Sequence, residues 1–311
     1  MNPWGVSRKR AVVGGIIALV VVIAAAGIVL LYFHPQSVST SPPTPATKKT
    51  WCKTFGGCYT EKAYDVEETE DGGFIVVGYT DTFGRGYSDV WLVKIDANGN
   101  IVWNRTFGGG GWDGAYDVVE TDDGSFVLFG YTGSFGGGRN FWMIKINETG
   151  EIVWDKKFGG PGDDYGYGIT RTSDGGFILT GSTASADVGI PDAWIIKTDA
   201  DGNMVWNRTF GGSEIDVAHD AVETQDGGIV VTGYTESYGN GGSDAFIIKI
   251  KPDGEMVWER FLGGVSEDIG KAVRTLNTGG FIIAGYSSSS GEGGYDFWLI
   301  KTDAEGIVEE L

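Results

Sequence analysis

Hydrophobic and polar positions beyond residue 50 follow the same order five times. Tryptophan marks the phase of this repeat at Trp51, Trp103, Trp154, Trp206 and Trp258, spaced 52, 51, 52 and 52 residues apart. Each unit contains short apolar runs rich in β-branched and aromatic residues, such as FIVVGY, WLVKI, AWIIK and FIIAGY. Runs of this length that are apolar at successive positions are typical of strands buried on both faces. The pattern therefore predicts short β-strands throughout residues 51–311.

Two hairpin turns divide each unit. The first turn contains Asp71, Asp123, Asp174 or Asp226 followed by glycine, and the second is Asn98-Gly99, Thr149-Gly150 or Asp201-Gly202. These residue pairs suit turns with positive φ. Four strands in a unit of about 50 residues are the pattern of a β-propeller blade. We predict an all-β fold, a five-bladed β-propeller with four-stranded antiparallel blades, whose inner strands lie near 63–69, 115–121, 167–173, 218–224 and 270–276.

The repeated segments FGGPGDDYGYGITRTSDGGFILTGST (158–183) and GGSDAFIIKIKPDGEMVWERFLGG (241–264) resemble the SBBP β-propeller repeat of prokaryotic surface and secreted proteins. The resemblance covers residues 51–311. It implies the propeller fold and a position outside the cytoplasm, but little about activity, because propellers carry many unrelated functions. The family name implies seven blades, whereas this sequence holds five units.

Ring closure follows from the order of the strands. Residues 50–56 read as an outer strand with no blade before it, and the last unit ends in a short outer strand at 307–311. We expect residues 50–56 to complete the last blade, because closure removes exposed sheet edges. The linker then leaves from the face of the tight turns, and the longer loops at 81–88, 133–139, 184–191, 236–243 and 288–295 point away from the membrane.

The N-terminal region predicts a membrane anchor. Residues 11–33 carry no charge and are long enough to span a bilayer as a helix, and Arg8, Lys9 and Arg10 precede them. The positive-inside rule places residues 1–10 in the cytoplasm and the propeller outside, as a single-pass signal-anchor protein of the cell membrane. The alternative is a pilin-like segment, cut near Ala11, that uses the helix for assembly. Residues 34–50 read as an extended linker rich in serine, threonine and proline.

Charge narrows the range of partners. The chain has 23 basic and 42 acidic residues, and its first 50 positions hold five of the basic residues and no acid, so the remainder carries a net charge of −24. A field of this sign repels phosphate backbones. We therefore expect no nucleic-acid partner, and instead an extracellular protein or glycan.

One acidic residue stands before each predicted inner strand. If the five carboxylates converge on the channel mouth, they would hold a hard cation such as calcium; otherwise each accepts hydrogen bonds from backbone amides of the adjoining blade. We expect no other cofactor. The candidate metal ligands are Glu61, Asp113, Asp164, Asp216 and Asp268.

Residues that break the repeat are candidates for ligand binding. Arg171 replaces a glutamate of the other inner strands, and His219 and Lys271 replace a tyrosine, so the channel is asymmetric. Salt bridges between blades are the alternative explanation for these charges. Aromatic residues among glycines in the long loops suit stacking on sugars or contact with a protein. The loop candidates are Trp112, Tyr165, Tyr238 and Tyr295.

Two further chemical features concern the surface. Cys52 and Cys58 form a disulfide only if the chain reverses at Gly56-Gly57, because six extended residues exceed disulfide reach. Glycosylation sequons begin at Asn104, Asn147 and Asn207, which fits a chain outside the cytoplasm.

The sequence contains no nucleophile elbow, zinc motif or phosphate loop. Its inner acids mostly obey the repeat, whereas a general acid and a base need different environments. We therefore expect a binding module and not an enzyme. A glycoside hydrolase-like propeller, with carboxylates in a central pocket, is the enzymatic alternative. A pilin-like assembly subunit is the third.

Overall fold

The computed structural model describes residues 22–24, 27–29, 50–185 and 189–308. The chain divides into two compact units, Met1–Lys49 and Thr50–Leu311, which are described separately. In the first unit the described residues form two short antiparallel strands, β1 (Val22–Ala24) and β2 (Gly27–Val29). The helix predicted at 11–33 lies outside the described residues apart from these six. Across the described part of the chain, no helix has the length and hydrophobicity needed to cross a membrane.

The second unit consists of five sheets, one for each sequence repeat. Blade one contains β3 (Glu61–Glu68), β4 (Phe74–Thr80), β5 (Asp89–Ile95) and β6 (Ile101–Phe107). Blade two contains β7 (Asp113–Glu120), β8 (Phe126–Thr132), β9 (Asn140–Ile146) and β10 (Ile152–Phe158). Blade three contains β11 (Asp164–Arg171), β12 (Phe177–Thr183), β13 (Asp192–Thr198) and β14 (Met204–Phe210). Blade four contains β15 (Asp216–Glu223), β16 (Ile229–Thr235), β17 (Asp244–Ile250) and β18 (Met256–Leu262), and blade five contains β19 (Asp268–Thr275), β20 (Phe281–Ser287) and β21 (Asp296–Thr302).

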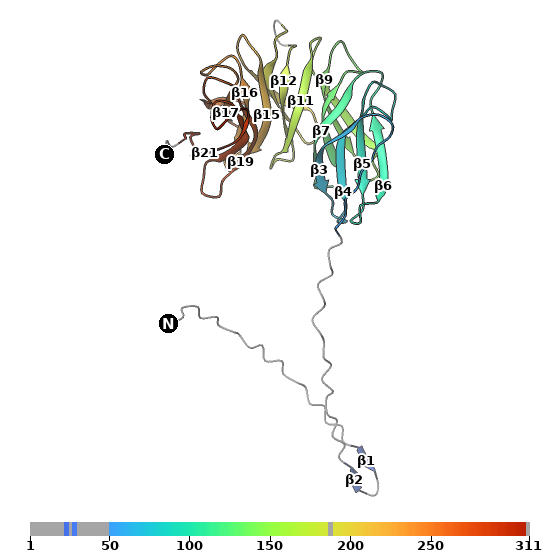
Figure 1. The fold of residues 1–311 in the computed structure, drawn as a ribbon. Helices are drawn as coiled ribbons and strands as arrows, with labels where there is room; N and C mark the ends of the chain where they lie inside the picture. The colour runs from blue at the N-terminus through green and yellow to red at the C-terminus, as the bar shows by residue number, and fades with distance from the viewer. Residues whose placement is uncertain (1–21, 25–26, 30–49, 186–188, 309–311) are drawn as a thin grey trace, which may run out of the picture. The chain divides into compact units, whose positions relative to one another are not determined.

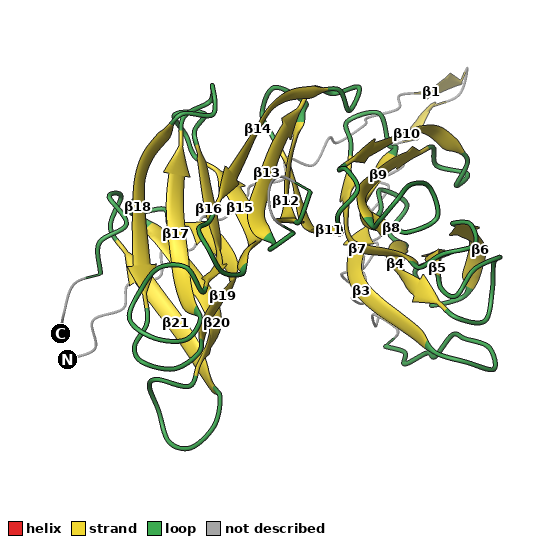
Figure 2. Cartoon of the chain, turned by 90° about the horizontal axis from the view of Figure 1, so that it is seen from above, coloured by secondary structure: helices red, strands yellow, loops and turns green. Residues whose placement is uncertain are grey.

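Each sheet is antiparallel and follows the order of the sequence from its inner to its outer strand. Successive blades pack side by side, and β3, β7, β11, β15 and β19 line the concave side of the resulting arc (Figures 1 and 2). The observed architecture is therefore all-β, with nineteen strands in propeller-like sheets. This confirms the predicted fold class at the level of the blades.

The blades are held together by apolar junctions between neighbouring sheets. At the first junction, Ile75 and Leu92 of blade one are fully buried against Val118 and Leu128 of blade two, and Trp103 packs at the edge of the same cluster. Equivalent clusters join the later blades. A single four-stranded sheet leaves both of its apolar faces in water, so each blade depends on its neighbours for burial.

The predicted ring closure is wrong for this structure, in which the arc is open. Blade one and blade five lie at opposite ends of the arc (Figures 1 and 2), and the described part of blade five has three strands. Residues 50–56 lie against blade one instead of completing blade five. There, the indole of Trp51 donates a hydrogen bond to the Ala97 carbonyl at 3.0 Å and packs edge-on against Phe74.

Lysine side chains fasten the first hairpin turn of four blades. The Lys94 Nζ atom lies 2.7 Å from an Asp71 carboxylate oxygen and also contacts the Thr69 hydroxyl, and Lys197 makes the same pair of contacts with Asp174 and Thr172. Because these lysines are buried, they need a counter-charge. Hydrogen bonds from Lys94 and Thr69 lower the pKa of Asp71. Those from Thr172 and Lys197 lower the pKa of Asp174 against the effect of burial. This arrangement explains why lysine recurs in the third strands.

Candidate functional site

A row of side chains on the concave surface contains one residue from each blade. The inner hairpin of every blade has a β-bulge, and the extra residue that it leaves without a cross-strand partner is the member of the row. Bulges redirect side chains and are frequent beside functional sites. We call this set the axial row; its members are Tyr64, Tyr116, Tyr167, His219 and Lys271.

Members of the axial row contact one another from blade to blade. The ring centroids of Tyr64 and Tyr116 are 4.6 Å apart, those of Tyr116 and Tyr167 are 5.6 Å apart, and those of Tyr167 and His219 are 5.3 Å apart. The row ends at Lys271, whose Nζ atom lies 2.7 Å from Nε2 of His219. Three phenols, an imidazole and an amine thus form one continuous line across the five inner strands.

The His219 imidazole is held in its neutral form. Burial lowers its pKa to about 3, and the neighbouring charge of Lys271 contributes to the same shift. An ammonium group can only donate hydrogen bonds, so Nε2 of His219 accepts the bond from Lys271. Burial also lowers the pKa of Lys271. The pair therefore combines a neutral imidazole nitrogen with an adjacent cation.

Tyrosines from the second strands form another layer beside the axial row. Tyr131 packs on Tyr116, Tyr234 packs on His219 with ring centroids 5.8 Å apart, and Lys271 lies over the ring of Tyr286 at 5.8 Å. Burial raises the pKa values of Tyr131 and Tyr167 to about 12, so their hydroxyl groups remain protonated. This surface therefore offers flat aromatic faces together with hydrogen-bond donors.

Carboxylates next to the axial row join neighbouring blades. Asp65 accepts a hydrogen bond from the Val118 amide at 3.1 Å, Asp117 accepts one from Ile169 at 2.8 Å, and Asp220 accepts one from Val273 at 2.9 Å. In blade three the corresponding residue is glycine, and hydroxyl groups of threonine bond to carbonyls of blade four instead. These aspartates support the backbone that presents the axial row.

Asp117 differs from the other bridging carboxylates in its electrostatics. Burial raises its pKa well above the ordinary value of aspartate, and a hydrogen bond with Asp65 and the charge of that group raise it further. Asp117 therefore keeps its proton at pH values where an exposed aspartate is ionised.

Arg171, proposed from the broken repeat, and Arg274, which the sequence has only in blade five, have partners in neighbouring blades. The guanidinium of Arg171 pairs with Asp122, which lies in the first turn of blade two. Arg274 pairs with Asp220 at 2.6 Å. Salt bridging between blades, the alternative interpretation, thus accounts for both side chains, although the partner of Arg171 is a turn aspartate and not the inner-strand glutamate expected. His219 and Lys271, in contrast, contact each other and the aromatic layer.

The four loop aromatics proposed from sequence do not form one cluster. Trp112 is 46% exposed and stacks on Tyr87 with ring centroids 5.3 Å apart. Tyr165 packs on Tyr131, and the guanidinium of Arg139 lies over its ring. The hydroxyl group of Tyr238 donates to the Gly211 carbonyl, and that of Tyr295 bonds to Glu267. Tyr165 is therefore part of strand β11 and of the aromatic layer, whereas the other three side chains lie in separate connections.

The acids before the inner strands, which are the candidate metal ligands, bond to backbone amides. These acids are the first residues of the inner strands, and Asp113, Asp164, Asp216 and Asp268 are fully buried. Each accepts a hydrogen bond from a glycine amide four residues earlier, and Glu61 does the same with Gly57. In the described ranges no group of three or more histidine, cysteine or acidic side chains is placed to hold a metal ion. The alternative interpretation, hydrogen bonding to backbone amides, explains why an acid recurs at this position in every blade.

The remaining predicted surface features lie away from the axial row. Cys52 and Cys58 are free and exposed, so the disulfide is not formed in this structure. Asn104 and Asn207 are exposed on outer strands. Asn147 begins the second turn of blade two, where its side-chain oxygen Oδ1 accepts hydrogen bonds from the backbone amides of Thr149 and Glu151.

Comparison with protein families gives a partial match. Residues 138–265, less than half of the chain, match the arylsulfotransferase (ASST) family, which is a β-propeller family. The matched segment carries Tyr167 and His219 of the axial row but not Lys271. The prediction that the chain is not an enzyme is contradicted by this match, because the family is one of enzymes. The resemblance to SBBP proteins is supported only at the level of the propeller fold.

Solved structures resemble the chain only distantly. A protein of unknown function from Bacteroides caccae is 12% identical, with 80% of each chain covered and a TM-score of 0.45. The Neurospora crassa Pan2 WD40 domain is 11% identical over 78% of this chain and 76% of its own, also with a TM-score of 0.45. The endo-arabinase of Bacteroides thetaiotaomicron is 10% identical over 80% and 98%, with a TM-score of 0.43. These similarities carry no functional argument, and no curated protein matches the chain.

Several residues of the site were not singled out by the sequence. Each bridging acid directly follows a member of the axial row in the sequence, and aligning the repeat units would have revealed this. These acids are Asp65, Asp117 and Asp220. The tyrosines of the row were visible as the residues that His219 and Lys271 replace. The layer formed by Tyr131, Tyr234 and Tyr286 required the pairing of the first two strands.

Proposed function

We propose that the chain is an enzyme that transfers a sulfuryl group from an aryl sulfate to a phenolic acceptor on the concave surface, with His219 as the nucleophile. The observation that carries this proposal is the short contact between Nε2 of His219 and the Nζ atom of Lys271 within a row of tyrosines. The match of residues 138–265 to the arylsulfotransferase family supports it.

The chemistry of an aryl sulfate fits the groups on this surface. The aromatic part stacks on tyrosine faces such as Tyr167 and Tyr234, which flank the imidazole. The sulfate oxygens bind the exposed ammonium of Lys271, which lies next to the imidazole. Binding draws the ammonium away from Nε2 of His219 and leaves the nitrogen lone pair facing the sulfur.

The proposed reaction has two balanced steps. In the first, the lone pair of Nε2 forms a bond to sulfur, and the bond between sulfur and the aryl oxygen breaks with its electron pair remaining on the phenolate. In the second, the oxygen of an acceptor phenol attacks the sulfur, its proton passes to solvent, and the nitrogen–sulfur bond breaks with its electrons returning to Nε2. The Lys271 charge stabilises the sulfuryl oxygens in both transition states.

Turnover of 4-nitrophenyl sulfate with phenol as acceptor tests this function. The full-length chain is expected to release nitrophenolate, and His219→Asn is expected to abolish release because the amide retains polarity but supplies no nucleophilic nitrogen. His34→Asn is the matched control, since it changes the other histidine and is expected to leave the rate unchanged. Equal activity of His219→Asn and wild type would refute the proposal.

A glycoside hydrolase is the second enzymatic candidate, because Asp117 has a raised pKa, as a general acid of such an enzyme does. These two side chains contact each other directly, whereas glycosidase carboxylates stand about 5 to 10 Å apart to accommodate the sugar and water. The bridging role of both aspartates also occupies their oxygens. Release of reducing sugar from a polysaccharide panel, lost in Asp117→Asn, would favour this alternative over sulfuryl transfer.

We further propose that residues 11–33 anchor the enzyme in a membrane with the propeller outside, and that the long loops assist substrate or glycan binding. The uncharged sequence of the segment and the exposed pair of Trp112 and Tyr87 support these proposals. Carbonate extraction of cell membranes tests the anchor. A chain anchored by residues 11–33 is expected to stay in the membrane pellet. Screening wild type and Trp112→Ala on a glycan array tests the loops, and equal binding would remove this role.

A further inference from the structure

The two ends of the arc expose residues whose counterparts are buried at all four blade junctions. On blade five, Leu299 is 69% exposed and Phe297 is fully exposed, whereas Leu92 and the equivalent residues of the other blades are buried. On blade one, Val66 is 54% exposed, whereas Val118 and its equivalents are buried. The outward face of blade five and the outward face of blade one are therefore the two halves of a blade junction.

Residues 51–55 complete the outward face of blade one. Trp51 and Phe55 occupy the positions that Trp103 and Phe107 occupy at the first junction. The indole of Trp51 donates to Ala97, 46 residues ahead, and the indole of Trp206 donates to Pro252 at the same separation. The segment thus lies on blade one as the outer strand of a preceding blade does.

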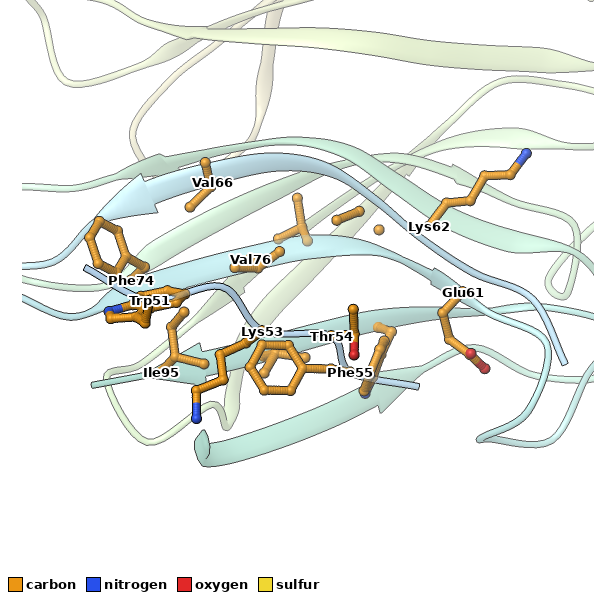
Figure 3. Close-up of a pocket in the computed structure, with 15 residues that line it drawn as sticks. Trp51, Lys53, Thr54, Phe55, Glu61, Lys62, Val66, Phe74, Val76 and Ile95 are labelled. Carbon is orange, nitrogen blue, oxygen red and sulfur yellow. The ribbon is translucent and has the colours of Figure 1, made fainter. Parts of the chain in front are cut away.

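A cavity of about 520 Å³ remains between this segment and the sheet. Figure 3 shows Trp51 beside Phe74 at one end of this cavity, with Val66, Val76 and Phe55 also among the residues that line it. At the internal junctions the corresponding space is filled by apolar side chains of the preceding blade, such as Ile75 and Leu92. The outward face of blade one therefore has the shape of an incomplete junction.

In the described part of blade five, no strand takes the place that residues 51–55 take beside blade one. Strand β21 pairs with β20 along one side, and the described residues place no strand on the other. In blade one the outer pair has Val93 opposite Asn104 and Leu92 opposite Arg105. The same register on β21 sets Ile300 opposite Cys52 and Leu299 opposite Lys53.

We propose that blade five of one chain binds blade one of a second copy, whose residues 51–55 add to β21 as the fourth strand. A second copy is the occupant because the two faces lie at opposite ends of the same arc (Figure 2), while together they reproduce a junction that this fold already forms four times. Such a head-to-tail contact is heterologous and continues into larger rings or rows. Strand addition supplies backbone hydrogen bonds, and the apolar faces supply burial.

Disulfide trapping between two differently tagged full-length chains tests this contact. One chain carries Ile300→Cys with Cys52→Ser, the other keeps Cys52 and Ile300, and both carry Cys58→Ser. Mild oxidation of the mixture is expected to give a disulfide-linked heterodimer that contains both tags. Replacing Ile300→Cys by Lys301→Cys, whose side chain points to the other side of β21, is expected to reduce the product at least about tenfold because strand side chains alternate.

A chain with both Cys52 and Ile300→Cys distinguishes the second copy from closure of one ring. Head-to-tail pairing predicts disulfide-linked oligomers of this chain. An internal disulfide in a monomer, with no product in the mixed experiment, would establish ring closure and overturn the proposal. No product in either experiment, with the far-ultraviolet circular dichroism of wild type retained, would also overturn it.

Discussion

The Nε2 atom of His219 lies 2.7 Å from the Nζ atom of Lys271, and the two residues occupy equivalent positions in successive blades. In the first three blades these positions hold tyrosine. The concave surface therefore changes from phenols to a nitrogen pair at one end of a continuous row. Two observations set the chemistry of the pair, the burial of the imidazole and the charge beside it.

Replacing Lys271 by methionine is expected to raise the pKa of His219. Burial is the larger cause of the low pKa, so the value should rise but remain below the ordinary value of about 6.5. Proton NMR titration of the imidazole measures this directly, because the chain has only two histidines and His34→Asn identifies the other signal. Arg274→Met removes a nearby cation that bonds to Asp220 and serves as the control. An unchanged His219 pKa in Lys271→Met would contradict the electrostatic coupling.

Substitutions at Tyr167 separate stacking from hydrogen bonding in the proposed reaction. Tyr167→Phe retains the ring and is expected to change KM for 4-nitrophenyl sulfate by less than about twofold, whereas Tyr167→Ala is expected to raise KM about tenfold. Steady-state kinetics of both variants measures the difference. If Tyr167→Ala leaves KM unchanged, the aromatic ring of the substrate does not stack on this residue.

Asp117→Asn is expected to stabilise the chain at neutral pH relative to wild type, by about 1 to 3 kcal/mol. The pKa of Asp117 is raised on folding, so ionising it costs stability as pH rises from the ordinary aspartate pKa through the folded value. Asparagine retains an acceptor for the Ile169 amide but carries no charge. Urea unfolding of both proteins across pH 4 to 9 checks this. A stability difference that does not grow with pH would show that Asp117 ionises normally.

The contact between Lys197 and the turn residue Asp174 should make stability change with pH in the opposite direction to Asp117. Contacts with Thr172 and Lys197 lower the pKa of Asp174 to about 2 against the effect of burial, so the stability that they provide is present above the ordinary pKa and is lost as pH falls through the folded value. Lys197→Met is expected to cost about 1 kcal/mol at pH 7, a value reduced by the exposure of the carboxylate, and the difference should shrink toward pH 2.

Lys301→Met is the matched control for this prediction. Lys301 occupies the equivalent position in blade five, where Thr278 replaces the turn aspartate, and its side chain is exposed. Its substitution is expected to leave the unfolding free energy nearly unchanged at every pH. Equal losses from both substitutions would mean that the ion pair does not stabilise the turn.

The sequence predicted the blades well because their signals are local and repeated. The turn chemistry and the apolar runs delimit strands such as Ile101–Phe107. The inner strands begin about two to three residues earlier than predicted, at buried acids such as Asp113 that were assigned to the preceding loop. A bulge at Tyr116 lengthens the strand, and a bulge has no distinctive residue signature.

Ring closure and the function of the site could not be predicted in the same way. Closure depends on the summed angles between blades, which no single unit encodes, so the expected pairing of residues 50–56 with blade five was wrong. His219 and Lys271 were visible as exceptions to the repeat, but their contact spans two blades. In the sequence the inner acids look equivalent, which suggested a binding protein. The burial that raises the pKa of Asp117 arises from packing between strands and is not visible in the sequence.

The most direct measurement is peptide mass mapping of the full-length chain after brief incubation with 4-nitrophenyl sulfate and no acceptor. The account predicts one added sulfuryl group on the peptide that contains His219, its loss when phenol is added, and its absence in His219→Asn. Sulfuryl transfer to phenol without any modified His219, or equal turnover by His219→Asn, would contradict the assignment of His219 as the nucleophile.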